Sequence, residues 1–116
     1  MKLYQYPNCS TCRQASKFLR ENGVDVTSID ISKQPPTEAE LEAMLAVYDG
    51  DIGKLFNRSG VRYRELKLKD SLPTMSSQQA IKLLAGDGKL IKRPFLITDH
   101  GQGVVGFKAD AWQEFV

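Results

Sequence analysis

The sequence is poor in the residues from which metal sites, disulfide frameworks and membrane spans are built. Its 116 residues include only two cysteines and one histidine, whereas a structural zinc site needs four ligands, usually Cys or His. No apolar run approaches the roughly 20 residues of a membrane helix. The N-terminal residues have neither the apolar stretch nor the small-residue cleavage site of a signal peptide. We therefore expect a cytoplasmic protein with no bound metal and no contact with a membrane.

An excess of charge of one sign is also lacking. Sixteen Lys and Arg against fourteen Asp and Glu leave a formal net charge of +2, far from the basic surface of a protein that binds nucleic acid by charge alone. Hydrophobic residues make up 41% and charged residues 26%, which is ordinary for a globular protein and too apolar for intrinsic disorder. The length allows one hydrophobic core. We expect a single domain over residues 1–116, a monomer, and no direct contact with nucleic acid.

Sequence periodicity predicts the elements at the two ends of the chain. An alternating, strand-like run comes first, followed by an amphipathic helix with an Asn-Gly stop and a second extended segment. The chain closes with two apolar runs joined by a five-residue loop, which predicts a β-hairpin, and with a last helix. The predicted ranges are a strand at 3–6, a helix at 11–22, a strand at about 24–29, hairpin strands at 95–98 and 104–107, and a helix from about 110 that includes Trp112 and Phe115.

The middle of the chain is predicted to be helical. Two pairs of residues, Thr37 with Glu40 and Ser76 with Gln79, have the spacing of a capping box. They predict helices from 37 to 48 and from 76 to 86, with a shorter helix at 52–57 between them. The whole order is that of a thioredoxin-like α/β fold with a mixed sheet. The segment at about 36–90 is then a helical insertion between its βαβ and ββα halves.

The two cysteines stand three residues apart in Cys9-Ser10-Thr11-Cys12, directly after the first predicted strand. A C-x-x-C pair occurs as half of a zinc site, as a redox pair, or as two buried small residues. A zinc site is disfavoured, because His100 is the one candidate ligand besides the two cysteines and a fourth ligand is lacking. A structural disulfide is disfavoured because it would close a loop too small to constrain the unfolded chain. A redox motif and two unreactive core thiols stay open.

The position of the pair favours redox chemistry. Cys9 faces unpaired N–H groups at the start of the predicted helix and the positive end of its dipole, which both favour the thiolate. Arg13, one helical turn further on, adds positive charge. Cys12 is placed to attack an adduct on Cys9 and to release it as an intramolecular disulfide. We therefore expect Cys9 to be the nucleophile and Cys12 the resolving thiol.

Two further arginines are candidates for an anion site. Arg93-Pro94 precedes the first hairpin strand, where thioredoxin-like proteins carry a cis proline that faces the active-site cysteines. We therefore predict a cis bond at Pro94, which would put Arg93 beside Cys9. Arg58 ends the short middle helix, where the alternative to an anion ligand is a solvated helix-end cation. His100, in a glycine-rich loop, has no partner at metal or triad spacing and is expected on the surface.

Five motifs together resemble the arsenate reductase and Spx family. They are C-S-T-C-R, K-L-F-N-R-S-G, L-K-L-K-D-S-L-P, D-G-K-L-I-K-R-P-F-L-I and V-G-F-K-A-D-A-W, and they follow the family order between Tyr4 and Phe115. The resemblance implies a thioredoxin-like fold with a helical insertion. Periodicity predicts the same fold independently.

One branch of that family consists of glutaredoxin-coupled arsenate reductases, in which a cysteine attacks arsenate and three arginines hold the oxyanion. The resemblance places Cys9, Arg58 and Arg93 at the nucleophile and at two of these arginines. The third position reads Gly-Phe-Lys, with Lys108 displaced and without a planar fork, and those reductases usually lack a cysteine at the place of Cys12. The resemblance implies a small oxyanion or thiol substrate and no bound cofactor, with thioredoxin, glutaredoxin or glutathione as the electron donor.

The other branch consists of Spx-type regulators, which the chain resembles in the C-x-x-C switch and in V-G-F before an acidic helix start. These regulators bind the C-terminal domain of the RNA polymerase α subunit, and a glycine of the early insertion contributes to that contact. Gly50 lies at the corresponding distance before Arg58; a turn glycine is the alternative. Two functions stay open: a thiol-disulfide oxidoreductase that acts on an oxyanion such as arsenate, and a redox-sensing regulator that docks on the polymerase.

Overall fold

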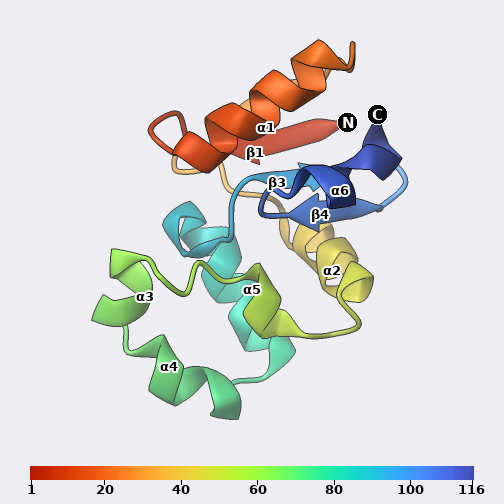
Figure 1. Ribbon diagram of the computed structural model, residues 1–116. Coiled ribbons are helices and arrows are strands. Elements are labelled where there is room, and N and C mark those ends of the chain that lie inside the picture. The colour runs from red at the N-terminus through yellow and green to blue at the C-terminus, as the bar shows by residue number, and fades with distance from the viewer.

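A four-stranded mixed sheet organises the chain, which a computed structural model describes over residues 1–116 (Figure 1). The strand order is β2-β1-β3-β4. The central strand β1 (Lys2–Gln5) runs parallel to β2 (Thr27–Asp30) and antiparallel to β3 (Phe95–Ile97). β3 then pairs antiparallel with β4 (Gly103–Val105) as the predicted hairpin. This mixed sheet, with its βαβ and ββα halves, confirms the predicted thioredoxin-like α/β fold.

Helices connect the strands, and most of them follow β2 and precede β3, where the helical insertion was predicted (Figure 1). None of the helices has both the length and the apolar character needed to cross a membrane. The α-helices are α1 (Ser10–Glu21), α2 (Glu38–Val47), α3 (Val61–Glu65), α4 (Leu68–Ser71), α5 (Ser77–Gly86) and α6 (Ala109–Trp112), and the 3-10 segments are Ile52–Leu55, Leu72–Thr74, Gly88–Leu90 and Gln113–Phe115.

Helices cover both faces of the sheet. Successive strand side chains point to opposite faces, so Leu3 packs with Leu96 on one face, where α1 supplies Leu19 and α6 supplies Trp112. Trp112 is fully buried, and its indole Nε1 donates to the carbonyl of Gly106 at 2.9 Å. This face anchors α1, and with it the two cysteines, against the sheet.

The opposite face carries the larger hydrophobic cluster, which joins the sheet to the insertion helices. Tyr4 and Phe95 lie on this face with ring centroids 5.8 Å apart in an edge-to-face arrangement. α2 and α5 pack over them through residues such as Leu41, Met44 and Leu84, all fully buried. Because α2 and α5 supply these buried side chains, the insertion is part of the hydrophobic core. No buried side-chain nitrogen or oxygen lacks a hydrogen-bond partner.

Both predicted capping boxes are present. At the start of α2 the Thr37 hydroxyl accepts from the Glu40 N–H at 3.1 Å, and the Glu40 carboxylate accepts from the Thr37 N–H at 3.0 Å. Ser76 and Gln79 make the same reciprocal pair at the start of α5. Side-chain oxygens thus satisfy backbone N–H groups that the helix itself leaves free.

The element boundaries differ from the predicted ones by a few residues. α1 begins and ends one residue earlier than predicted, and both hairpin strands are shorter. The predicted helix at 52–57 is only the 3-10 segment Ile52–Leu55, because Phe56 leaves it to form an isolated bridge with Ile91. α3 and α4 were not predicted from the sequence. They are separated by Lys67, whose φ of 52° breaks the helical path.

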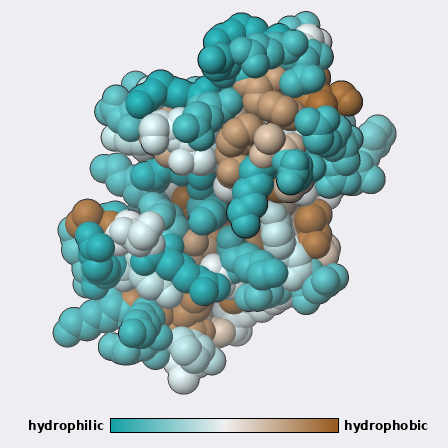
Figure 2. Space-filling model, viewed as in Figure 1, coloured by the Kyte–Doolittle hydropathy of each residue, from teal (hydrophilic) through white to brown (hydrophobic).

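Hydrophilic residues cover most of the visible surface, and the larger hydrophobic area in this view lies beside α1 and near the C-terminus (Figure 2). Four large hydrophobic residues are exposed, namely Val47, Val61, Leu66 and Val116. Val61 and Leu66 stand at the two ends of α3, whereas Val47 and Val116 lie elsewhere in the chain. Isolated exposed hydrophobic residues are normal on a globular protein.

Candidate thiol and anion site

Cys9 lies at the N-terminus of α1. It is the N-cap residue, with an extended backbone at φ −97° and ψ 119°, and its side chain makes no capping hydrogen bond. Its own N–H donates to the carbonyl of Tyr6 at 3.0 Å, which closes a tight turn after β1. The half-buried thiol is therefore held where the helix has free N–H groups and a positive dipole end.

The two cysteines are chemically different. Burial alone raises the pKa of the Cys9 thiol, but interactions with the backbone N–H and thiol of Cys12 and with the Arg93 guanidinium outweigh burial and hold that pKa below its ordinary value. Cys12 is fully buried, and burial together with the neighbouring Cys9 raises its pKa to about 12. The structure therefore favours a thiolate on Cys9 and a protonated thiol on Cys12.

Arg93 is the cation beside Cys9. The Arg93-Pro94 bond is cis, which confirms that prediction, and the guanidinium of Arg93 interacts with the Cys9 thiol. The guanidinium carbon also lies 4.9 Å from the centroid of the Tyr6 ring. The predicted neighbourhood of Arg93 and Cys9 is thus present, with an aromatic partner that the sequence interpretation missed.

Arg58 is held by the 3-10 segment that precedes it. Its Nε donates to the carbonyl of Gly53 at 3.0 Å. Gly53 is buried, and a Cβ atom at this position would collide with the terminal nitrogen Nη2 of Arg58. The side chain is therefore tied to its own segment, and its remaining N–H groups are free to meet an anion.

Cys9, Arg58 and Arg93 line one cavity of about 1200 Å³. Three loops or helix ends, far apart in the sequence, bring them together. Lysines extend the positive lining, and Asp51 is its single carboxylate. Lys108, the residue displaced from the third arginine position, lines the same cavity. The charged residues of the lining are Asp51, Lys54, Arg58, Lys92, Arg93 and Lys108.

Arg13 lies outside this cavity. It is exposed, and its Nη1 donates to the carbonyl of Pro7 at 3.1 Å. A side chain at the start of a helix can reach back to the preceding loop, and here Arg13 fixes the turn that carries Cys9. The structure thus brings Arg58 and Arg93 to the cavity of the thiol and does not bring Arg13 there.

Gly50 is exposed in the turn after α2. Its φ is +82°, a left-handed conformation that glycine adopts without strain, and its N–H donates to the carbonyl of Leu45 at 2.9 Å. Asp49 beside it has a φ of 57°. The interpretation of Gly50 as a turn glycine is confirmed, while a contact with a partner stays a prediction. His100 is exposed in the hairpin loop, as predicted.

The sequence interpretation missed three kinds of residue around the thiol: the aromatic support of Arg93, the glycine under Arg58, and the additional lysines. The doubled basic pair Lys92-Arg93 was a signal for the lysines. No sequence pattern distinguishes Tyr6 or Gly53: Tyr6 contacts an arginine far away in the sequence, and the contact of Gly53 with Arg58, five residues later, depends on how the arginine side chain folds back. The missed residues are Tyr6, Gly53, Lys54 and Lys92.

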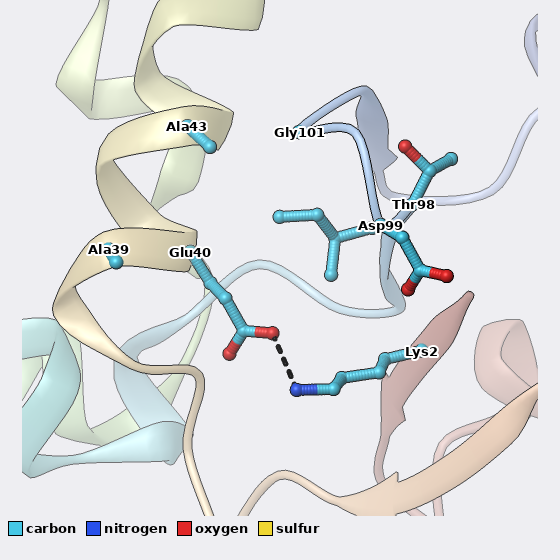
Figure 3. A pocket seen from close by; sticks show the side chains of 8 residues that line it. Lys2, Ala39, Glu40, Ala43, Thr98, Asp99 and Gly101 are labelled. Carbon is cyan, nitrogen blue, oxygen red and sulfur yellow. Dashed lines mark hydrogen bonds and ion pairs between the residues drawn. The ribbon is translucent and has the colours of Figure 1, made fainter.

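A second cavity of about 310 Å³ lies between α2 and the β3–β4 loop and contains no thiol (Figure 3). Its central carboxylate, Glu40, is already engaged: it accepts from the Tyr4 hydroxyl at 2.7 Å and from Lys2 at 3.1 Å. Burial opposes ionisation, but these hydrogen bonds and that from Thr37 keep the pKa of Glu40 below its usual value. Glu40 thus joins the sheet to α2 and has a structural role.

Neither cysteine is bridged, and both are free thiols in this structure. No group of three or more His, Cys, Asp or Glu side chains has an arrangement that could hold a metal ion. The large cavity offers a nucleophilic thiolate, a second thiol beside it, and cationic side chains that attract an anion.

Comparison with known proteins relates the chain to both enzymes and regulators. The profile of the ArsC family matches residues 4–115. The uncharacterized protein YusI of Bacillus subtilis is 47% identical over 114 residues, which are 98% of this chain and 96% of YusI. An arsenate reductase of Rhizobium meliloti is 31% identical over 85% of this chain and 69% of its own length. The global transcriptional regulator Spx 1 of Bacillus cereus is 25% identical over 98% of this chain and 85% of its own.

Solved structures share the whole architecture. An ArsC family related protein from Bacteroides fragilis superposes with a TM-score of 0.91 and 44% identity, covering 100% of this chain and 98% of that chain. The structure of a possible arsenate reductase from Streptococcus mutans has a TM-score of 0.86 and 42% identity, covering 93% of this chain and 91% of that chain. The fold and the chain length therefore match those of these proteins nearly end to end.

Proposed function

The chain belongs to the ArsC family, and from that premise we propose that it is a thiol-disulfide oxidoreductase with Cys9 as the nucleophile and Cys12 as the resolving thiol. The observation that carries the proposal is the contrast between the two thiols. Cys9 has a lowered pKa and lines a cationic cavity, whereas Cys12 is buried with a pKa of about 12. A mechanism with two thiols needs this difference in pKa, because the nucleophile must be a thiolate to attack the substrate and the resolving thiol must stay protonated until the adduct has formed.

The first step is attack by the Cys9 thiolate on an anionic substrate in the cavity. Arg93 stabilises the thiolate, and Arg58 and Lys108 supply positive charge for the substrate. With a disulfide substrate, Cys9 displaces one sulfur as a thiolate and forms a mixed disulfide with the other. With an oxyanion such as arsenate, the sulfur replaces one oxygen, which leaves as water after taking up two protons.

The second step is attack by Cys12 on the Cys9 sulfur. It forms the Cys9–Cys12 disulfide and transfers two electrons to the departing group, which leaves as a thiolate or as the reduced oxyanion, arsenite in the case of arsenate. The Tyr6 N–H, 3.4 Å from the Cys12 sulfur, stabilises Cys12 as it deprotonates. Thioredoxin, glutaredoxin or glutathione then reduces the disulfide and restores the dithiol.

The direct test is the pH dependence of Cys9 alkylation. We expect a midpoint below the value of about 8.5 of an ordinary cysteine, because Cys12 and Arg93 stabilise the thiolate. Cys12 should stay unlabelled through neutral pH because its pKa is raised to about 12. Fragmentation of the alkylated peptide by mass spectrometry separates the two sites, and Cys9→Ser is the control. An ordinary midpoint for Cys9 would contradict the proposal.

Arsenate is the first oxyanion to test, because an arsenate reductase is among the relatives. The assay follows arsenate-dependent oxidation of NADPH with a thioredoxin or a glutaredoxin coupling system. Turnover that depends on Cys9 would establish arsenate as a substrate. Absence of such turnover in both systems removes arsenate and leaves disulfides as the substrate class.

A redox-sensing regulator is the second candidate, supported by the Spx relative and by the exposure of Gly50. The partner would be the C-terminal domain of the RNA polymerase α subunit. A Cβ atom on Gly50 meets no other atom within 4 Å, so this turn has open space for a partner.

Gly50→Arg should abolish capture of the chain by the polymerase α C-terminal domain if this turn is the contact. Because an arginine is strained at a φ of +82°, the control is Gly23→Arg. Gly23 has a φ of +71°, is exposed, and likewise has no atom within 4 Å of an added Cβ. Loss of binding in Gly50→Arg alone supports the regulator. Equal behaviour of the two variants rules out this docking site.

A further inference from the structure

Tyr6 contacts Cys9, Cys12 and Arg93. Its N–H donates to the Cys12 sulfur at 3.4 Å, and its carbonyl accepts from the Cys9 N–H at 3.0 Å. Its ring lies under the guanidinium of Arg93, 4.9 Å from the ring centroid to the guanidinium carbon. One residue of the turn after β1 therefore meets both cysteines through its backbone and the nearby cation through its side chain.

The ring is the neutral anchor of Arg93. Arg93 takes part in none of the ion pairs of the molecule. A carboxylate could also fix the guanidinium, but its negative charge would cancel the positive charge that stabilises the thiolate. An aromatic face attracts the cation through its quadrupole and leaves its net charge intact. Tyr6 can thus restrict the position of Arg93 without weakening its field at Cys9.

The geometry of a guanidinium allows both contacts at once. Its planar face stacks on an aromatic ring, while its N–H donors point outward in the plane. The Arg93 guanidinium carbon lies over the Tyr6 ring, and stacking there leaves the N–H donors at its edge available to the Cys9 sulfur and to a substrate anion. Since the charge of Arg93 acts on both Cys9 and Cys12, its position affects attack as well as resolution.

We propose that Tyr6 is a positioning residue of the thiol site, whose aromatic ring holds the Arg93 guanidinium against the Cys9 sulfur. This inference rests on the proposed function, because it assigns to Tyr6 the support of a reactive Cys9 thiolate. The face of the ring is the feature that matters, and the hydroxyl is not required. Tyr6 acts through Arg93, so the effect of Tyr6 on Cys9 should disappear when Arg93 is replaced by an uncharged residue.

The test measures the alkylation rate of Cys9 by neutral iodoacetamide from pH 5 to 10. In Tyr6→Leu the midpoint should rise, and the rate below the midpoint should fall about threefold, the equivalent of a weak cation–π contact. At pH 10 the rates should converge, because Cys9 is then a thiolate in both proteins. Tyr6→Phe keeps the ring face and should restore the profile of the unchanged protein.

A double-mutant cycle separates positioning from general damage. In an Arg93→Met background, Tyr6→Leu should cause no further change in the profile, because the cation it positions is absent. Tyr48→Leu is the matched control. Tyr48 lines the same cavity and has Lys54, not Arg93, at 5.8 Å from its ring, and neither Tyr48 nor Lys54 contributes to the lowered pKa of Cys9. Its removal should leave the Cys9 midpoint unchanged. The other charged groups facing the cavity stay the same in all variants: Asp51, Lys54, Arg58, Lys92 and Lys108.

The outcomes keep the two proposals apart. An ordinary midpoint for Cys9 in the unchanged protein overturns the proposed function. A low midpoint that Tyr6→Leu does not move, or that moves equally in the Arg93→Met background, overturns only the role of Tyr6. If Tyr6→Leu does not fold, Tyr6→Met, which fills similar space without an aromatic face, gives the same comparison.

Discussion

Replacing Cys12 with serine should arrest the protein at the covalent adduct on Cys9. With a neutral dialkyl disulfide as substrate, the unchanged protein should proceed to the Cys9–Cys12 disulfide, whereas Cys12→Ser should accumulate a mixed disulfide. The arrest is expected because the resolving thiol is the intramolecular nucleophile, and such neighbours react with effective concentrations far above those of external thiols. Steady-state turnover with thioredoxin as reductant should fall at least about a hundredfold. Intact-protein mass spectrometry and NADPH oxidation measure the two effects.

The electrostatics of the pair explain why resolution follows attack. Part of the raised pKa of Cys12 comes from the neighbouring Cys9. Once Cys9 has formed an adduct, it no longer carries negative charge, and this contribution disappears. The Tyr6 N–H and the charge of Arg93, which both lower the pKa of Cys12, then act against burial alone. The first step therefore activates the thiol that performs the second.

Cys9→Ser is the matched control for this experiment. It should form no adduct at all, because the buried Cys12 thiol has a pKa of about 12 and cannot replace the nucleophile at neutral pH. Cys12→Ser that turns over at the rate of the unchanged protein would contradict a resolving role. An external thiol would then complete the reaction, as in a mechanism with a single protein cysteine.

The sheet and the thiol motif could be predicted from the sequence because their signals are local. Strand alternation, the Asn-Gly stop of α1 and the two capping boxes each depend on residues within a few positions of one another. The short helices α3 and α4 could not be predicted in this way. Each has one buried residue, Tyr63 or Leu68, among charged neighbours. A single apolar residue does not create the repeating pattern of hydrophobic residues from which a helix can be predicted.

The composition of the cavity was only partly predictable. Arg93 could be placed beside Cys9 because the cis proline position is fixed by the fold. Helical spacing suggested that Arg13 would also face the thiol, but a long side chain can turn toward the preceding loop, and it does so here. Tyr6 and Arg93 are far apart in the sequence, so their contact becomes apparent only in the three-dimensional structure.

The segment that carries Arg93 is joined to the segment that carries Arg58 by backbone hydrogen bonds. The Asn57 N–H donates to the carbonyl of Leu90 at 2.7 Å, and the Lys92 N–H donates to the carbonyl of Leu55 at 2.7 Å. These two bonds flank the Phe56–Ile91 bridge. The cationic lining of the cavity thus depends on the backbone path at residues 88–92.

Gly88→Ala should destabilise the protein by about 3 kcal/mol or more. Gly88 is buried, and a Cβ atom there would collide with the backbone carbonyl of Ile31, directly after β2. A backbone oxygen cannot rotate away as a side chain can, so the segment at 88–92 has to move. The melting temperature should fall by more than about 10 °C. Chemical denaturation with urea measures the free energy of unfolding.

Gly86→Ala, two residues earlier, is the matched control. Gly86 is the last residue of α5, is exposed, and has no atom within 4 Å of an added Cβ. Alanine is the better helix former, so this variant should gain up to about 1 kcal/mol of stability. Equal stability of the two variants would mean that the contact between Gly88 and Ile31 relaxes freely. A loss confined to Gly88→Ala, together with a Cys9 alkylation midpoint displaced toward about 8.5, would establish that this close backbone contact sets the position of Arg93.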